Sequence, residues 1–405
     1  MPVFVGIDVA KETHWVTAVD EQARIVHDGA VVNDQAALVA LAQGLKALGD
    51  EVVVALDVTG SIAAFLEAVL ASEGLALVHG EPLSATGPRT MASGIAVNRA
   101  GQGYAGGERK SDPRDARTIA DLARTRPGLR PILHDGATTV ALRLLVSRRG
   151  DLVEDQTRRL SRLRQLLSQI HPGLERRLDV TKKAPLALLT RFVTPTEIRT
   201  AGARRIAVHL DRTPHLRGTR ALAEEVVGIA KTQTIAVPGQ AIAAELIREL
   251  ATEASAAKIR IAAIDRELEA LLAIHPDGAL IRSLPGMGVV LAAEFLAHLG
   301  AIQRFHSADA LAAAAGLAPV LRQSGRSRAL RRATGGDRAL KRALFQSAFC
   351  AVMTRDPVSF AHYQRKRREG KLHTQAIIAL ARSRVTVLWA MLNSREPYRP
   401  MQNAA

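Results

Sequence analysis

The chain has 405 residues, 47% hydrophobic and 23% charged, a balance typical of folded globular proteins and not of disordered segments. At roughly 150 residues per domain, this length predicts two or three domains. Lys and Arg together number 55 against 39 Asp and Glu, so the net charge is +16 and a polyanion is the expected partner.

Most of the basic residues are Arg, whose planar guanidinium binds phosphate through two hydrogen bonds, which favours nucleic acid over an anionic membrane. A GC-rich genome also raises the Arg content, and composition alone leaves that alternative open. Aromatic residues make up only 3% of the chain, so we expect contacts with backbone phosphates to outweigh base stacking.

The single cysteine, Cys350, excludes an intrachain disulfide, and no Cys and His residues have the spacing of a zinc site. The N-terminal segment MPVFVGIDVAKE leads directly into a strand-like run, and no uninterrupted stretch of about 18 apolar residues occurs. We therefore expect a cytoplasmic, nucleoid-associated protein with no membrane partner.

The N-terminal segment predicts alternating strands and helices. Three short strands rich in Val and Ile are expected at residues 3–9, 14–19 and 24–32. A helix from about residue 35 to Gly49, a strand at 52–56, a helix at 61–72 and a strand at 75–79 are expected to follow. The predicted order is βββαβαβ, and the Gly-rich residues 84–107 are predicted to form a loop.

Helices are expected to dominate the rest of the chain. The spacing of Leu and Ile predicts two long amphipathic helices at residues 138–171 and 241–274, and the prolines between residues 182 and 239 predict short helices there. The two long helices can pack as an antiparallel pair or join two subunits, and the pattern leaves both open. Residues 280–394 are predicted to be helical and are strongly basic.

Two carboxylates lie on strands that the predicted topology makes neighbours. Asp8 lies in the first strand and Asp57 ends the fourth, and in a βββαβ arrangement these strands are adjacent and parallel. The two side chains can therefore approach each other. Carboxylates suit Mg²⁺ or Mn²⁺, and a pair of such ions can activate a nucleophile and stabilise the leaving oxygen in phosphodiester chemistry.

Asp112 and Asp115, in KSDPRDARTIADLA, are three residues apart and share one helix face, so they can extend such a metal site. They can also cap the helix, because acids are favoured at its positive end and Pro113 suits the first helical position. Taken alone, such a pair is more often a cap than a metal ligand.

The segments FVGIDVAKETHWV, ALDVTG and KSDPRDARTIADLA resemble, in order and spacing, the three parts of the RuvC-like DEDD domain of IS110-family insertion-sequence transposases, which are related to the Piv and MooV DNA invertases. The resemblance implies an RNase H-like domain in which Asp8, Asp57, Asp112 and Asp115 are catalytic metal ligands. The family usually has Glu where this chain has Asp57, a difference of one methylene that bears on metal distance and rate. The Gly-rich segment before Lys110 is also longer than is usual in the family.

Two motifs mark the C-terminal region. In SLPGMGVVL, residues 283–291, Gly286 and Gly288 can present backbone N–H groups to a phosphate, or they can simply connect two apolar helices. Ser324 lies among arginines that suit a serine attacking a phosphodiester. No general base is nearby in sequence, and a Ser-Gly pair in a basic loop is usually a plain turn.

GLAPVLRQSG and GGDRALKRALFQSA resemble the C-terminal transposase domain of the same family, in which a serine at the position of Ser324 is the nucleophile. The resemblance implies a serine-linked DNA intermediate and a homo-oligomer, dimer or tetramer, that combines the carboxylates of one subunit with the serine of another. It also implies a structured noncoding RNA as a partner that often directs the reaction. The residues expected to contact nucleic acid are Lys110, Arg114, Gly286, Gly288, Arg322, Arg326, Arg328, Arg331, Arg332, Lys341 and Arg342.

The predicted architecture is α/β plus α: an RNase H-like domain at residues 1–130, a helical or coiled-coil connector at 131–279 and a mainly helical transposase domain at 280–395. The predicted function is that of a DNA transposase or site-specific recombinase. Two alternatives remain at this stage: a metal-dependent junction-resolving nuclease that uses only the carboxylates, and an inactive nucleic-acid-binding protein on a nuclease fold.

Overall fold

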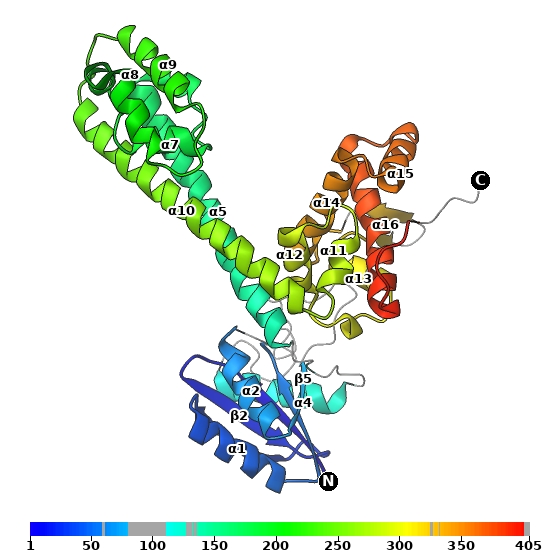
Figure 1. Cartoon of the computed structure of the whole chain (residues 1–405). Coiled ribbons are helices and arrows are strands. Elements are labelled where there is room, and N and C mark those ends of the chain that lie inside the picture. Colours follow the sequence, from blue (N-terminus) through cyan, green and yellow to red (C-terminus); the bar gives the residue numbers. More distant parts are fainter. Residues whose placement is uncertain are drawn as a thin grey trace. The chain divides into compact units, whose positions relative to one another are not determined.

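The computed structural model describes residues 1–58, 61–79, 111–126, 132, 136–324, 327–331 and 333–400. The chain divides into two compact units, of which unit 1 comprises residues 1–136, 283–286 and 298–405 and unit 2 comprises residues 137–282 and 287–297. A mixed sheet and many helices make up these units (Figure 1). The Gly-rich loop predicted at residues 84–107 lies outside the described residues.

A five-stranded mixed sheet forms the N-terminal part of unit 1, with the strand order β3-β2-β1-β4-β5. The strands are β1 (Pro2–Asp8), β2 (Thr13–Val19), β3 (Ile25–Val32), β4 (Glu51–Leu56) and β5 (Ala76–His79). β1, β2 and β3 are antiparallel neighbours, whereas β4 and β5 continue the sheet parallel to β1. The predicted βββαβαβ order and the adjacency of the first and fourth strands are confirmed.

One face of this sheet packs on α1 (Gln35–Ala47) and α2 (Ala64–Ser72). Val3, Val5 and Ile7 of β1 lie in this core, as the period of two along a strand requires. Asp34 begins α1 by accepting a hydrogen bond from the backbone N–H of Ala37, at 2.8 Å. The helix predicted at residues 61–72 begins with a 3₁₀ turn, η1 (Ser61–Ala63), before α2.

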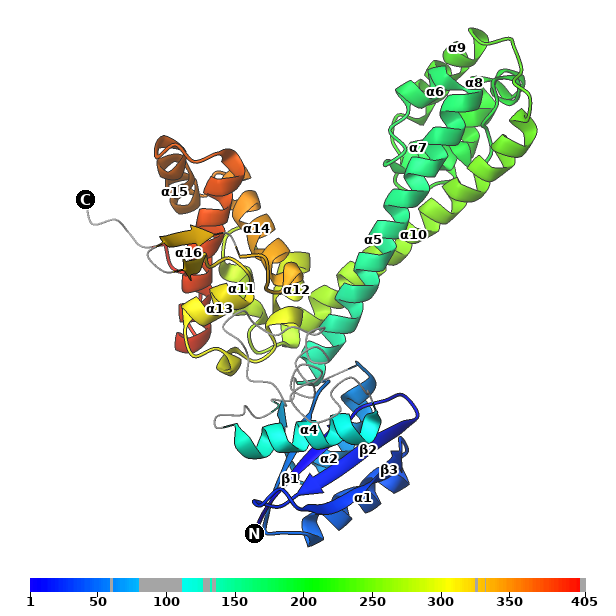
Figure 2. The same ribbon diagram turned by 180° about the vertical axis from the view of Figure 1, so that it is seen from behind.

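The other face of the sheet packs on α4 (Asp112–Thr125), which lies across it in Figure 2. Phe4 of β1 packs against a cluster that includes Ile119 and Ala123 of α4. A Cβ atom added at Gly6 would lie 2.1 Å from the carbonyl oxygen of Ala116, so only glycine allows this helix to approach the strand so closely.

Two long helices, α5 (Ala137–Ile170) and α10 (Gln240–Ile274), run along unit 2 and confirm the predicted helices to within one residue at each end. The two helices pack antiparallel: residues with higher numbers on α5 contact residues with lower numbers on α10. The contacts that show this are Thr139 with His275 (3.0 Å), Arg149 with Asp265 (2.6 Å), Gln156 with the carbonyl of Ala254 (3.2 Å) and Arg159 with Glu253 (2.7 Å). Of the two arrangements that the sequence left open, the structure therefore contains the pair within one chain.

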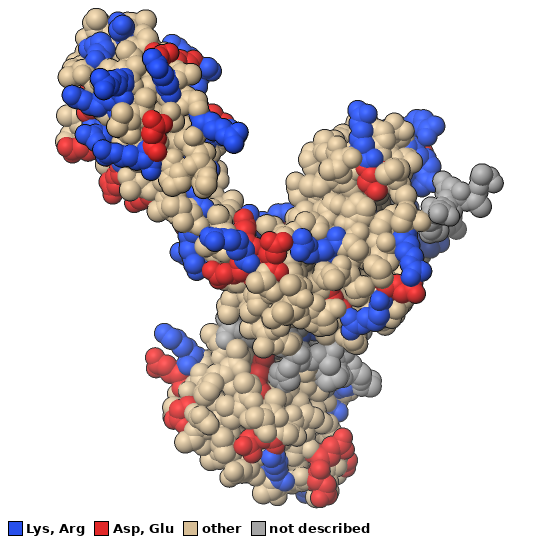
Figure 3. All heavy atoms as spheres, viewed as in Figure 1, with Lys and Arg blue, Asp and Glu red and all other residues tan. Residues whose placement is uncertain are grey.

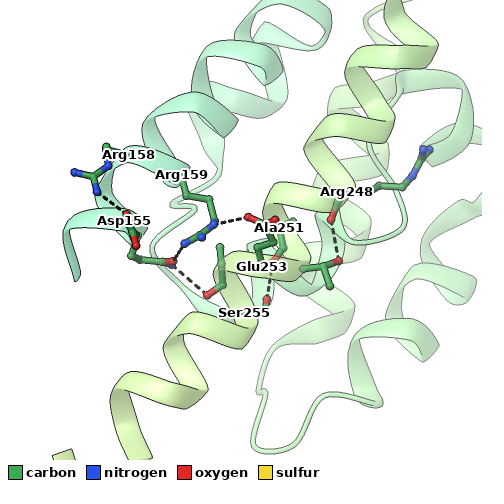
Figure 4. A network of polar contacts seen from close by, with 10 residues as sticks. Asp155, Arg158, Arg159, Arg248, Ala251, Glu253 and Ser255 are labelled. Carbon is green, nitrogen blue, oxygen red and sulfur yellow. Dashed lines mark hydrogen bonds and ion pairs between the residues drawn. The ribbon is translucent and has the colours of Figure 1, made fainter. Parts of the chain in front are cut away.

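The polar contacts between these helices are shown in Figure 4. Arg159 of α5 donates to Glu253 across the pair, whereas Arg158 pairs with Asp155 on its own helix. Glu253 and both partners of the second pair are well exposed, so these ion pairs contribute little to stability. The buried Leu163 and Ile247, both 0% exposed, contribute more by burial of apolar surface.

A compact helical subdomain caps one end of α5 and α10 (Figure 1). It contains α6 (Pro172–Arg177), α7 (Lys183–Leu189), α8 (Pro195–Asp211) and α9 (Thr219–Lys231), and its core includes Leu174, Leu188, Ile206 and Val226. The prediction of short helices in this stretch is confirmed for α7, whereas α8 has 17 residues and contains a break at Gly202 (φ 68°, ψ 166°). The break explains why the sequence shows no continuous helical period there.

The helices near the C-terminal end are α11 (Gly278–Ser283), α12 (Val289–Leu299), η2 (Ile302–Arg304), α13 (Ala308–Ala314), α14 (Arg338–Met353), α15 (Pro357–Arg368) and α16 (His373–Ser394). The region is mainly helical, as predicted, but the antiparallel hairpin of β6 (Val320–Ser324) and β7 (Ser327–Arg331) was not predicted. These short, Arg-rich strands lack a clear alternation of apolar and polar residues, so the period of two was not visible. Within the described residues, α16 alone is long and apolar enough to span a membrane, yet half of its most apolar stretch is buried and it packs on α13, α14 and α15.

Candidate active site

Asp8 and Asp57 lie side by side at the ends of neighbouring parallel strands. Ile7 pairs with Leu56 in the β1–β4 ladder, so the next residue of each strand comes at the same edge of the sheet. Asp8 is half-buried, and Asp57 is only 8% exposed. On β1, Asp8 shares the α4 face of the sheet with Gly6, two residues before it.

Asp112 and Asp115 occupy the first turn of α4. This helix runs opposite to β1, because Ala123 packs near Phe4 whereas Ala116 lies over Gly6. One more turn toward the helix N-terminus therefore reaches the level of Asp8. The side chain of Asp115 lies close enough to Asp57 to act on it electrostatically, whereas Asp112 is exposed.

The carboxyl group of Asp57 is in an unfavourable environment for a negative charge. Burial raises its pKa above the ordinary value, and the charge of Asp115 raises the pKa further, although the backbone N–H groups of Val9 and Val58 oppose the rise. Its Oδ1 atom is buried and has no hydrogen-bond partner among the described residues. A buried, unpartnered carboxylate oxygen beside a second carboxylate suits a bound cation, since a cation would neutralise both.

The capping interpretation of Asp112 is not supported in the form expected from the sequence. The N-cap of α4 is Ser111, whose side chain makes no capping hydrogen bond, and the helix begins at Asp112. Pro113 therefore stands at the second helical position and not at the first. Proline is tolerated there, because backbone N–H groups in the first turn have no acceptor within the helix and the missing N–H loses no hydrogen bond. Acids in this turn still interact favourably with the helix dipole.

Within the described ranges, no three Asp, Glu, His or Cys side chains group closely enough to hold a metal ion by themselves. The structure places Asp115 near enough to Asp57 for their charges to interact, places Asp8 at the end of the strand beside Asp57, and leaves Asp112 exposed on the same helical turn as Asp115. A site built from all four carboxylates stays a prediction. Arg114, which was also expected to contact nucleic acid, is half-buried. Lys110 lies outside the described residues.

Ser324 is the last residue of β6 and pairs with Ser327, the first residue of β7. Gly325, which follows Ser324 in the sequence, is outside the described residues. Arg322 lies in β6, and Arg328 and Arg331 lie in β7, where Arg328 is exposed. Arg326 and Arg332 are outside the described residues.

The chain segments before and after this hairpin cross closely. A Cβ atom at Gly336 (φ 99°) would lie 2.5 Å from the backbone nitrogen of Gly316 (φ 62°), so both left-handed glycines are required for the crossing. Lys341 donates to the carbonyl oxygen of Gly316 at 2.8 Å. This lysine therefore has a partner inside the protein, and its contact with nucleic acid stays a prediction, as does that of the exposed Arg342.

His298 and Asp337 form a side-chain hydrogen bond that the sequence did not indicate, with 3.1 Å between Nδ1 and Oδ2. Asp337 is also the N-cap of α14 and accepts from the backbone N–H groups of Ala339 (2.7 Å) and Leu340 (3.0 Å). Burial opposes ionisation of Asp337, but the bonds from His298 and from these N–H groups outweigh it and hold the pKa below the ordinary value. The segment GGDRAL before a helix has the pattern of an N-cap and predicts the role of Asp337, whereas no local signal indicates His298.

The Pro-Gly-Met-Gly turn is confirmed between α11 and α12, but its first glycine has an internal role. A Cβ atom at Gly286 (φ 80°) would lie 2.4 Å from the carbonyl oxygen of Ser347 on α14, so the turn packs tightly there. At Gly288, an added Cβ atom would meet none of the described residues within 4 Å. Arg384 of α16, which the sequence did not single out, is 4% exposed and donates to the carbonyl of Pro285 and, at 2.7 Å, to the Ser347 hydroxyl.

Known proteins resemble this chain in both its N-terminal and its C-terminal parts. A transposase family model, that of the IS110 DEDD domain, matches residues 5–172, and a second, described as "Transposase IS116/IS110/IS902 family", matches residues 278–364. The chain is 40% identical to the insertion element IS900 42 kDa protein of Mycobacterium paratuberculosis, over 100% of this chain and 99% of that protein. It is 37% identical to the insertion element IS116 44.8 kDa protein of Streptomyces clavuligerus, over 98% and 96% of the two chains.

A more distant relative is named for the inversion of a gene. The chain is 31% identical to the pilin gene-inverting protein of Moraxella bovis over 34% of this chain and 45% of that protein. The first matched region includes Asp8, Asp57, Asp112 and Asp115, and the second includes Ser324, as expected from the motifs. From the family models and the full-length relatives together, we conclude that the chain belongs to the IS110/IS116/IS902 family of transposases and is a DNA transposase or recombinase enzyme.

Proposed function

We propose that this transposase cuts and rejoins DNA with two sets of groups, the carboxylates at the edge of the N-terminal sheet and the hydroxyl of Ser324. The observation that supports the first set most strongly is Asp57, a buried carboxylate with a raised pKa, an oxygen unpartnered among the described residues and a second carboxylate beside it. The strand order, with two parallel strands added to an antiparallel hairpin pair, supports an RNase H-like assignment for residues 1–130.

The carboxylates of this edge have the chemistry that a divalent cation prefers, and binding would have to draw them closer together than in this structure. In the proposal, Asp8, Asp57 and Asp115 would hold Mg²⁺ or Mn²⁺, and Asp112 would complete the set from the same helical turn. When bound, such an ion neutralises phosphate charge and acidifies an oxygen nucleophile. The carboxylates of the chain position the phosphate, because their own geometry is set by β1, β4 and α4, three elements packed into one core.

Ser324 is proposed to act as the nucleophile. Its hydroxyl oxygen would form an ester bond with the scissile phosphorus while the bond to one strand oxygen breaks and that oxygen takes up a proton. Attack of a strand hydroxyl on the same phosphorus would then release the serine and rejoin DNA, so that no external energy source is required. Arg322, Arg326, Arg328, Arg331 and Arg332 would neutralise the phosphates around the reaction.

The partners of the reaction are part of the same proposal. DNA is the substrate, and the name of the Moraxella pilin gene-inverting protein supports recombination between two segments. A homo-oligomer, dimer or tetramer, would supply the serine and the carboxylates from different subunits. A structured noncoding RNA would direct the complex, and the basic excess of the chain is compatible with holding its backbone.

Four proteins test the proposal: the wild type, Ser324→Ala, Ser324→Cys and Asp57→Asn, each incubated with Mg²⁺ and end-labelled DNA containing the ends of the element. We expect a covalent protein–DNA adduct with the wild type, none with Ser324→Ala, and nearly unchanged DNA binding for all four. Asp57→Asn should also form no adduct. Strand cleavage by Ser324→Ala at the wild-type rate would remove the serine from the mechanism and support a metal-dependent nuclease instead.

A further inference from the structure

The α6–α9 subdomain carries four arginines that have no partner among the described residues. Arg204 and Arg205 lie on α8, and Arg212 and Arg217 lie in the segment that follows it, before α9. All four are exposed. Within the described parts of the chain, none of these side chains makes a hydrogen bond, an ion pair or a ring contact.

Four other arginines of unit 2 do have an acidic partner. Arg149, Arg159, Arg177 and Arg248 are each paired with an acid, namely Asp265, Glu253, Glu225 and Glu197. Among the described residues, no acid lies within ion-pair distance of the four free arginines.

Asp211 accepts from the hydroxyl of Thr219 at 2.7 Å, and Glu224 pairs with Arg220 at 3.1 Å. The Thr219 hydroxyl leaves Asp211 charged, but Asp211 makes no ion pair with any of the four arginines, which therefore have no direct acidic partner among the described residues. Mutual repulsion of the cations costs stability, and a polyanion would relieve it.

The free arginines of α8 belong to one side of the helix. Ile206 and Leu210, both 0% exposed, face the core of the subdomain, so Arg204, Arg205 and the 52% exposed Val208 lie on the outer side. Arg212 continues this side one turn further on. In Figure 3, Lys and Arg side chains stand out over the end of the unit that carries α8 and α9 in Figure 1.

The chemistry of this surface suits phosphate more than bases. Residues 203–217 contain no Phe, Trp or Tyr, so base stacking is not available there. Arginine binds phosphate oxygens through two parallel hydrogen bonds, and it does so without selecting a sequence. None of the carboxylates, glycines or basic residues predicted for catalysis or nucleic-acid contact belongs to this subdomain.

We propose that Arg204, Arg205, Arg212 and Arg217 form a phosphate-binding surface that holds the backbone of a nucleic acid, away from the reacting groups in the sequence and on a subdomain with its own core. The inference rests on the proposed function in so far as the partner is DNA or RNA. It gives the α6–α9 subdomain, which lies between α5 and α10 in the sequence, a role in binding nucleic acid in addition to its predicted role as part of a connector.

The test uses the full-length protein and a charge-matched control. The binding variant replaces all four arginines with Gln. The control replaces Arg148, Arg162, Arg176 and Arg266 with Gln, because these are arginines of the same unit that likewise have no ion-pair partner among the described residues. Both variants lose the same four charges, and thermal unfolding checks that both retain the fold.

Fluorescence anisotropy then measures binding of a labelled duplex DNA of about 30 base pairs, a single-stranded DNA and an RNA hairpin of arbitrary sequence, each over a series of KCl concentrations. We expect at least about a tenfold loss of affinity for the binding variant at about 0.1 M salt, and a slope of log K against log salt that is smaller by about 2 to 4, because roughly one counterion is released per phosphate contact. The control should lose clearly less.

Each outcome decides something. A loss confined to duplex DNA assigns the surface to DNA, a loss confined to the hairpin assigns it to RNA, and a loss with every probe assigns it to backbone phosphates in general. Unchanged affinity and slope, or an equal loss in the control, overturns the proposal. If the wild type itself binds none of the probes, the proposed function fails as well, whereas a wild type that binds and a variant that binds equally well refute only this surface.

Discussion

Replacement of Gly6 with Ala should separate the carboxylates without altering any of them. A Cβ atom at this position would lie 2.1 Å from the carbonyl oxygen of Ala116 and 2.3 Å from the backbone nitrogen of Ala120, both in α4. Ordinary contact begins at 3.4 Å, so α4 must retreat by about 1.3 Å for the alanine to fit. Backbone atoms cannot swing aside as a flexible side chain can, and the whole helix has to move.

This displacement has two expected consequences. Overpacking of a tight interface should lower the free energy of unfolding by about 1–3 kcal/mol. Because α4 carries Asp112 and Asp115 whereas β1 and β4 carry the other two carboxylates, the distances between the pairs should grow by about 1 Å. Metal ligands tolerate only about 0.2 Å, and a misplacement of about 1 Å costs about 100-fold in rate, so Mg²⁺ binding and cleavage should both be lost.

The matched control is Gly29→Ala on β3 of the same sheet, where an added Cβ atom meets none of the described residues within 4 Å. Isothermal titration with Mg²⁺ or Mn²⁺, thermal unfolding, and DNA cleavage should be compared for both variants. Gly29→Ala should match the wild type or be slightly more stable, because alanine loses less backbone entropy than glycine on folding. If Gly6→Ala binds the ion and cuts DNA as Gly29→Ala does, either α4 does not approach β1 as described or its carboxylates are not part of the site.

Variants at three further positions test other charges of unit 1. Burial and Asp115 raise the pKa of Asp57, so ionisation of Asp57 destabilises the metal-free fold increasingly as the pH rises above about 4 through the raised pKa. The melting temperature of Asp57→Asn should therefore exceed that of the wild type at about pH 7 but not at about pH 4. Added Mg²⁺ should stabilise only the wild type. Asp337→Ala removes the N-cap of α14 and should lower the stability in urea by about 1–2 kcal/mol, whereas Asp337→Asn should lose less. Because the pKa of Asp337 is held below its ordinary value, its contribution is complete above about pH 4 and is lost as the pH falls through the lowered pKa, so the Ala variant and the wild type should converge in acid; a constant difference would contradict this. Arg384→Met should cost about 3 kcal/mol, because the Pro285 carbonyl and the Ser347 hydroxyl lose their buried donor, and an unchanged urea midpoint would show that they find another.

Local pattern determined much of the N-terminal half. The strands of the first sheet, the helices between them and the two long helices follow from hydrophobic periodicity, because the spacing of buried side chains can be read along each segment by itself. The position of Asp8 and Asp57 on neighbouring strands follows from strand order in the same way. The motifs around them also carried the resemblance to the transposase family that the comparisons confirm.

Tertiary structure decided what depends on contacts between distant segments. The compact subdomain of α6–α9 and the pairing of α5 with α10 inside one chain are set by packing that no local window contains. His298 meets Asp337 across 39 residues, and Arg384 meets Pro285 across 99. The sequence shows which arginines the chain has, but only the fold shows which of them the protein neutralises and which it leaves exposed, because ion pairing requires partners within about 4 Å in space and not along the chain.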